Sequence, residues 1–162
     1  MIGNTLVIGD SWASALESDT GLHRGSTAVQ WARDEDGRLT KAIAASKNVD
    51  CVVISLFGND VRHYADDGKI TLYEVLDSLK AMRKVIGSFS HVKHVVLLAY
   101  CDPYFGANLQ SSIGIPLINS VVRLSSAGTF NTTVFQTGDI LRPEHFDGSA
   151  FILTWPAIKL LP

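Results

Sequence analysis

The chain has 162 residues, of which 46% are hydrophobic and 19% charged; this is the composition of a globular protein and excludes an intrinsically disordered one. Fourteen basic against 16 acidic residues give a net charge of −2, so nothing electrostatic favours nucleic acid or an anionic membrane as partner. No stretch approaches the length of a membrane span, and the N-terminus lacks the pattern of a signal peptide. We therefore expect a soluble protein, either cytoplasmic or part of a larger particle.

Strand and helix signals alternate along the chain. Apolar runs predict strands at residues 6–8, 49–57, 94–100 and 132–136, with at most one further brief strand at residues 21–25. Capped or amphipathic segments predict helices at residues 11–17, 28–32, 39–47, 71–86, 111–125 and 150–161. There is no repeat or linker, so we expect one domain over residues 1–162.

This alternation predicts a three-layer α/β/α sandwich around a mainly parallel sheet of four to five strands. The run at residues 51–57 is apolar without alternation, which is typical of a parallel strand covered on both faces. In such folds ligands bind beyond the carboxyl ends of the strands. The residues that directly follow each predicted strand are therefore the candidates for a functional site.

Those positions hold a possible nucleophile, an amide donor and a histidine: Ser11 after the first strand, Asn59 after the second, and His145 in the loop after the last. A serine hydroxyl needs a base such as imidazole to become a nucleophile at neutral pH. The oxyanion that then forms needs preorganised N–H donors. The alternative is that Asp10 and Ser11 only cap a helix.

Four short blocks, in this order, resemble the SGNH (GDSL-like) hydrolases: residues 9–11 (Gly-Asp-Ser), residues 25–27 (Gly-Ser-Thr) followed by Trp31, residues 58–60 (Gly-Asn-Asp), and His145 ahead of a C-terminal helix. These are esterases and lipases on a flavodoxin-like sheet, and the resemblance spans nearly the whole chain. It implies a flavodoxin-like version of the expected sandwich.

The resemblance also implies roles for individual residues. Ser11 would be the nucleophile and His145 the general base, while Gly25 and Asn59 would complete the oxyanion hole together with the Ser11 N–H. Asp10 and Asp60 would fix the turns around them. No cofactor and no metal is expected, since no cluster has metal-ligand spacing and neither Cys51 nor Cys101 belongs to one.

Three departures from the family pattern bear on these roles. Arg142 stands where the family usually carries an aspartate three residues before the histidine, so the imidazole needs another orienting group. A backbone carbonyl is one possibility, and the acidic side chains of this loop are others: Asp139, Glu144 and Asp147.

The second departure is in the third block. Phe57 occupies the position two before the asparagine, where the family has glycine, which could change the turn that aims the Asn59 amide. The spacing from Ser11 to Gly25 is short, and Gly37 competes for the role of second-block glycine.

Several aromatic and histidine residues have a plain structural explanation beside a functional one. Trp12 and Trp31 are either core residues or the lining of an acyl or sugar pocket. His23 and His63 lie near the predicted active edge, whereas His91 and His94 precede a strand and fall at the opposite edge.

The favoured hypothesis is a serine esterase that hydrolyses a small acyl ester through an acyl-enzyme. The favoured substrate is an acetyl ester on a carbohydrate. Its partner would be a small-molecule or glycan ester, with no nucleic acid and no membrane, and its oligomeric state is left open. The alternative is a non-catalytic module that binds a glycan or a protein on an SGNH-like fold after losing the triad acid. A nucleotide-binding protein is a third possibility, but the sequence has no Gly-rich phosphate loop of the usual spacing.

Overall fold

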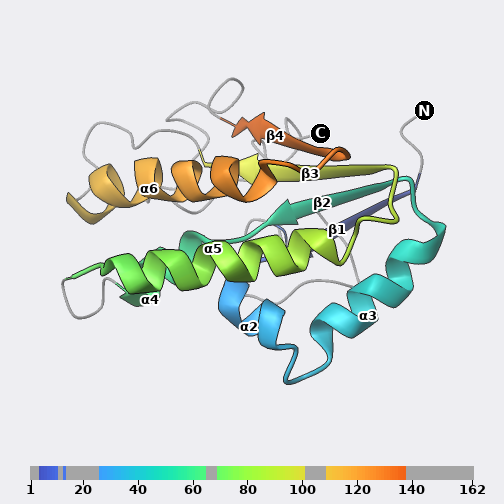
Figure 1. The fold of residues 1–162 in the computed structure, drawn as a ribbon, viewed down its shortest axis with the longest axis horizontal. Helices are drawn as coiled ribbons and strands as arrows, with labels where there is room; N and C mark the ends of the chain where they lie inside the picture. The colour runs from blue at the N-terminus through green and yellow to red at the C-terminus, as the bar shows by residue number, and fades with distance from the viewer. Residues whose placement is uncertain (1–3, 11–12, 14–25, 65–68, 101–108, 138–162) are drawn as a thin grey trace.

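Four parallel strands form the centre of the computed structural model, which describes residues 4–10, 13, 26–64, 69–100 and 109–137. They lie side by side in chain order: β1 (Thr5–Gly9), β2 (Cys51–Ser55), β3 (His94–Ala99) and β4 (Thr132–Gln136) (Figure 1). Val7 pairs with Val53 across the first two strands, and Val53 pairs with Val96 across the next. Because all four strands run the same way, their carboxyl ends share one edge of the sheet.

Helices connect the strands. They are α2 (Ala28–Arg33), α3 (Arg38–Ala45), the short 3₁₀ helix η1 (Ser46–Asn48), α4 (Gly58–Tyr64), α5 (Leu72–Gly87) and α6 (Leu109–Ser126). In Figure 1, α5 and α6 lie side by side along the sheet, with α2 next to α5. Helix α6 contains Pro116.

Both faces of the sheet are buried. On one face, side chains such as Ile8, Ile54 and Leu97 pack with residues from α2, α3, α5 and α6 in one large core cluster. On the other face a smaller cluster is made of Val7, Ala13, Val53 and Leu98. This two-sided burial explains why the sequence of β2 is apolar without alternation.

Two helices begin with the same local device. Thr27 caps α2 and Thr71 caps α5; each threonine hydroxyl accepts a hydrogen bond from the backbone N–H three residues later. The side chain at that later position, Gln30 or Glu74, accepts one in return from the cap's N–H. These reciprocal bonds satisfy N–H groups that the helix cannot pair internally, and they fix where each helix starts.

The α/β fold with a four-stranded parallel sheet flanked by helices is confirmed, and the described helices fall where the sequence predicts them, with one exception. The seven-residue α4, which follows the second strand, lies outside the predicted helices. The possible strand at residues 21–25 and the helices at 11–17 and 150–161 fall largely or wholly outside the described residues. That residues 1–162 form one domain stays a prediction. In the described part of the chain, no helix is long and apolar enough to cross a membrane.

Candidate active site

Five polar side chains gather where the strands end. Asp10 follows β1, Asn59 and Asp60 lie in the first turn of α4 after β2, Tyr100 follows β3, and Ser26 precedes α2. They belong to four separate stretches of the chain, and hydrogen bonds connect these stretches to one another. The expectation that polar residues after the strands meet at one edge is therefore met for the described residues.

Asp10 is the centre of the first part of this cluster. Its side chain is buried, at 1% exposure, and its two carboxylate oxygens accept bonds from two other strands' ends. Ser55 Oγ donates to Oδ1 over 3.1 Å, and Tyr100 Oη donates to Oδ2 over 2.6 Å. The Asp10 backbone N–H donates to the Ser55 carbonyl over 2.9 Å. These bonds fix the peptide that directly precedes Ser11.

Tyr100 is held at both ends. Its backbone N–H donates to Asn119 Oδ1 and its carbonyl accepts from Asn119 Nδ2, each over 2.8 Å, so α6 fixes the main chain at this point. Burial, and then the neighbouring Asp10 carboxylate, raise the pKa of the Tyr100 hydroxyl well above its ordinary value of 10. The hydroxyl therefore stays protonated and acts as the donor to Asp10.

The backbone at the ends of β1 and β2 adopts conformations that glycine favours. Gly9 has φ +138°, and a Cβ there would overlap the carbonyl oxygen of Ser55. Phe57, at the position where the family pattern has glycine, takes φ +93° although its side chain is almost fully buried. A positive φ costs a non-glycine residue energy, so packing of the Phe57 ring has to hold this turn in place. The departure from the pattern is in the side chain, while the backbone keeps a glycine-like angle.

Asn59 reaches toward the segment before α2. Its Nδ2 donates to the carbonyl oxygen of Ser26 over 3.1 Å. Ser26 Oγ in turn donates to the carbonyl of Gly9 over 3.1 Å and accepts from Trp31 Nε1 over 3.0 Å. Ser26 therefore connects the end of β1 to the amide of Asn59. Trp31 is fully buried in the core, which agrees with its interpretation as a core residue and not with the lining of a pocket.

Asp60 anchors the start of α2. One oxygen accepts from the Ala28 N–H over 2.8 Å, and the other lies 3.4 Å from the Val29 nitrogen, which donates to it, and 3.3 Å from the hydroxyl of Ser78. Burial raises the pKa of Asp60 to about 6, and these three bonds oppose it without cancelling it. The loss of hydration thus outweighs the stabilisation that the helix N–H groups give the charge.

Of the four predicted site residues, the structure describes one. Asn59 lies at the carboxyl edge, as expected, while Ser11, Gly25 and His145 fall outside the described residues. The positions proposed for orienting the imidazole, together with Arg142, fall outside them as well. The described residues nevertheless include the chain neighbours of two of these predicted site residues: Asp10 directly precedes Ser11, and Ser26 directly follows Gly25.

Gly37, the competing candidate for the oxyanion hole, sits elsewhere. It is the N-cap of α3 with φ +71°, beyond the far end of α2 from Ser26. A helix of six residues spans about 9 Å, so Gly37 is separated from the Ser26–Asn59 contact by the length of α2. His91 and His94 lie at the amino edge of the sheet; His91 Nε2 is 2.9 Å from Ser46 Oγ.

Sequence reasoning missed Tyr100 and Ser55 as parts of the site. It placed Tyr100 inside a strand and looked for functional groups at residues 101 and 102, whereas β3 ends at Ala99. The signal that could have found this tyrosine is its place as the last residue of an apolar run. Its partner Asp10 lies 90 residues earlier, and no local pattern connects the two.

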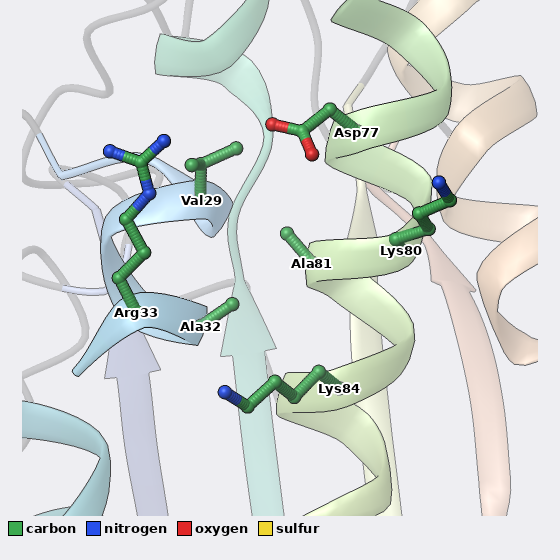
Figure 2. A pocket seen from close by; sticks show the side chains of 7 residues that line it. All are labelled: Val29, Ala32, Arg33, Asp77, Lys80, Ala81 and Lys84. Carbon is green, nitrogen blue, oxygen red and sulfur yellow. The ribbon is translucent and has the colours of Figure 1, made fainter.

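A surface pocket of about 250 Å³ lies between α2 and α5, and none of the five clustered side chains lines it. Figure 2 shows its lining, which combines a small apolar floor with charged side chains: Val29, Ala32, Arg33, Asp77, Lys80, Ala81 and Lys84. None of these is a hydroxyl, thiol or imidazole, so the lining offers no nucleophile of the kind the predicted chemistry needs. We do not assign the predicted reaction to this pocket.

Comparison with known proteins finds similarity in structure only. No family model and no curated protein sequence matches the chain. Among solved structures, LAE5, an α/β hydrolase from the metagenome of Lake Arreo in Spain, superposes with a TM-score of 0.71 at 11% identity, covering 98% of this chain and 90% of that one. The acetylxylan esterase Axe2 from Geobacillus stearothermophilus gives a TM-score of 0.65 at 18% identity, covering 98% and 91%. The acetyl xylan esterase AlAXEase gives 0.60 at 20% identity, covering 83% and 77%. At these identities the similarity establishes the fold.

Proposed function

We propose that this protein is a serine esterase of the SGNH (GDSL-like) type that hydrolyses a small acyl ester, with acetyl esters of carbohydrates as the favoured substrates. One observation carries the proposal. A continuous chain of hydrogen bonds joins Gly9, Ser26 and Asn59 at the carboxyl edge of the sheet. Gly9 and Ser26 are each within two residues of a proposed catalytic position, Ser11 and Gly25. Described residues of three of the four sequence blocks are thus brought together.

The proposed reaction is acyl transfer in two steps. Ser11 Oγ attacks the acyl carbon while His145 takes its proton, and the carbonyl oxygen becomes an oxyanion held by N–H donors. The intermediate collapses, the bond to the alcohol breaks, and His145 gives the proton to the departing alcohol. Water then attacks the acyl-enzyme with His145 as base, which releases the carboxylic acid and restores Ser11.

The described contacts favour Gly25 over Gly37 in the oxyanion hole. Asn59 Nδ2 already lies 3.1 Å from the carbonyl of Ser26, the residue next to Gly25. A primary amide carries two N–H groups, so donation to Ser26 orients the amide and leaves its second N–H for an oxyanion. Gly37 lies beyond the other end of α2 and has no such link to Asn59 in the described structure.

The similar structures support an esterase that removes acetyl groups. Axe2 and AlAXEase are described as acetyl xylan esterases. The forms of Axe2 described as catalytic mutants replace a serine and a histidine with alanine. The pair proposed here, Ser11 and His145, consists of the same two residue types.

The alternative is a binding module on the same fold, which Arg142 in the place of the usual aspartate favours. Arg142 would then contact a ligand or form an ion pair at this edge. The two functions differ in one measurable respect, since a binding module has no activated serine.

A chromogenic acetate ester and a serine-directed phosphonate separate the two functions. The wild-type protein should hydrolyse the ester and carry a single covalent label on Ser11. Ser11→Ala should lose both, with a fall in kcat on the order of 10⁴-fold or more, because no other group can form the acyl-enzyme. Ser88→Ala is the matched control, since it removes a serine hydroxyl that donates to the Lys84 carbonyl at the end of α5, on a helix that carries none of the proposed catalytic residues. Hydrolysis that survives in Ser11→Ala, or a wild-type protein that takes no label, contradicts the proposal.

A further inference from the structure

The side chain of Tyr100 crosses the end of the central strand β2. It starts at the end of β3 and its hydroxyl reaches Asp10 at the end of β1, over 2.6 Å. Strands two positions apart in a sheet are separated by roughly 10 Å, so only a long side chain with a terminal donor can bridge them. Tyr100 is therefore a direct connection between strands that are not neighbours.

Both ends of this connection are fixed. Asn119 on α6 pairs with the N–H and the carbonyl of Tyr100, and the side chain of Tyr100 is 3% exposed. At the other end, the Asp10 carboxylate is also held by Ser55 Oγ. A buried hydrogen bond to an ionised or strongly polar acceptor is short and strong, and here neither partner can move without breaking others.

The tyrosine also packs against the start of α4. A Cβ on Gly58 would overlap the Tyr100 hydroxyl, so the first residue of α4 lies directly against it. The preceding residue, Phe57, holds its positive φ and its buried ring at the same turn. The backbone one residue before Asn59 is thus packed against the same hydroxyl that binds the residue before Ser11.

We propose that Tyr100 is a positioning residue of this site. By bonding to Asp10 and packing on Gly58, it fixes the residue before Ser11 relative to the residue before Asn59. This role rests on the proposed esterase function. Tyr100 acts through the two neighbouring residues and does not itself contact the substrate. Such a residue should affect the rate of acyl transfer, which depends on the geometry of attack, much more than the binding of the ester.

Tyr100→Phe tests the role, because it keeps the ring and removes the hydroxyl that donates to Asp10. We expect kcat for a chromogenic acetate ester to fall roughly 10- to 100-fold, the size of loss that a misplacement of about 1 Å produces, while KM changes less than about twofold. The rate of phosphonate labelling at Ser11 should fall by a similar factor. Ser125→Ala is the matched control: it removes a buried hydroxyl, bonded to the Val122 carbonyl near the end of α6, and should leave kcat unchanged.

Asp10→Asn and the double variant identify the path of the effect. If Tyr100 acts through Asp10, the double variant should be little slower than the slower single variant, because residues in one hydrogen-bonded network are not additive. If the losses of rate in the two single variants multiply in the double variant, Tyr100 does not act through Asp10. An unchanged kcat and labelling rate in Tyr100→Phe, or a change confined to KM, overturns the positioning role alone. A wild-type protein without hydrolysis or label overturns the proposed function and this role together.

Discussion

Gly9, the last residue of β1, and Phe57, two residues after the end of β2, both have a positive φ, and different interactions maintain each of them. Gly9 has no alternative, because a Cβ at this point would overlap the backbone of Ser55. Phe57 holds the same sign of φ through burial of a large ring, whose transfer out of water offsets a backbone cost of about 1–3 kcal/mol. The first is fixed by the approach of two strands and the second by the core.

Gly9→Ala and Gly37→Ala distinguish close approach from backbone angle. Gly37 also has a positive φ, but nothing lies within 4 Å of the place its Cβ would take. Gly37→Ala should therefore lower the free energy of unfolding by only about 1 kcal/mol, the cost of a left-handed alanine. Gly9→Ala should lower it by more than about 4 kcal/mol or prevent folding, since the Ser55 carbonyl would have to move. Urea unfolding of the two variants measures both values; equal losses would mean that φ alone sets the cost.

Among the helices, α2 takes its position from α4. The Asp60 carboxylate binds the first N–H groups of α2, and the neighbouring Asn59 amide binds the carbonyl of Ser26 just before it. Thr27 caps the same helix locally. Two adjacent residues of one helix therefore hold the segment that leads from Gly25 into the next, so the oxyanion hole proposed here is a product of the contact between these helices.

The buried Asp60 should make stability depend on pH. Its pKa is about 6 in the fold against 3.8 in a free side chain, so the folded protein holds its proton where the unfolded chain has lost it. Stability from this group is therefore fully present below about pH 4 and is lost as the pH rises through 6, by on the order of 3 kcal/mol. The free energy of unfolding of Asp60→Asn, measured in urea from pH 4 to pH 8, should lack this decline. A wild-type minus variant difference that is flat over this range would show that Asp60 is not the cause.

The sequence predicts elements well where local signals are strong. The apolar residues of α5 recur at three- and four-residue spacing, and Thr71 with Glu74 marks its start. No such pattern marks α4, whose seven residues begin at a glycine. The polar side chains of its first turn form hydrogen bonds to Ser26 and Ala28, which are distant in the sequence. The site follows the same division. Asn59 and Asp10 could be placed because strand ends share an edge, whereas the role of Tyr100 depends on a contact across 90 residues.

At the scale of the whole molecule, the proposed site is built next to a strand that is protected on both sides and on both faces. Strand β2 lies between β1 and β3, so it is hydrogen-bonded on both sides, and its middle residues are buried on both faces. Val52, Val53 and Ile54 are each at most 4% exposed. Asn59 follows this strand after only three intervening residues. The amide proposed for the oxyanion hole thus follows closely after one of the two inner strands of the described sheet.

Hydrogen exchange should rank the strands accordingly. Backbone amides of residues 52–54 open only when the sheet unfolds, because both neighbouring strands and both covering layers must separate, so their protection should equal the global free energy of unfolding. The strand β4 is half-buried or more exposed along its length and pairs with β3, its neighbour in the described sheet, so its amides should exchange at lower cost. Exchange measured by mass spectrometry on peptides from residues 51–55 and 132–136 tests this order. Equal protection in the two peptides would mean that the sheet opens as one unit, and that the rigidity at Asn59 owes nothing to the central place of β2.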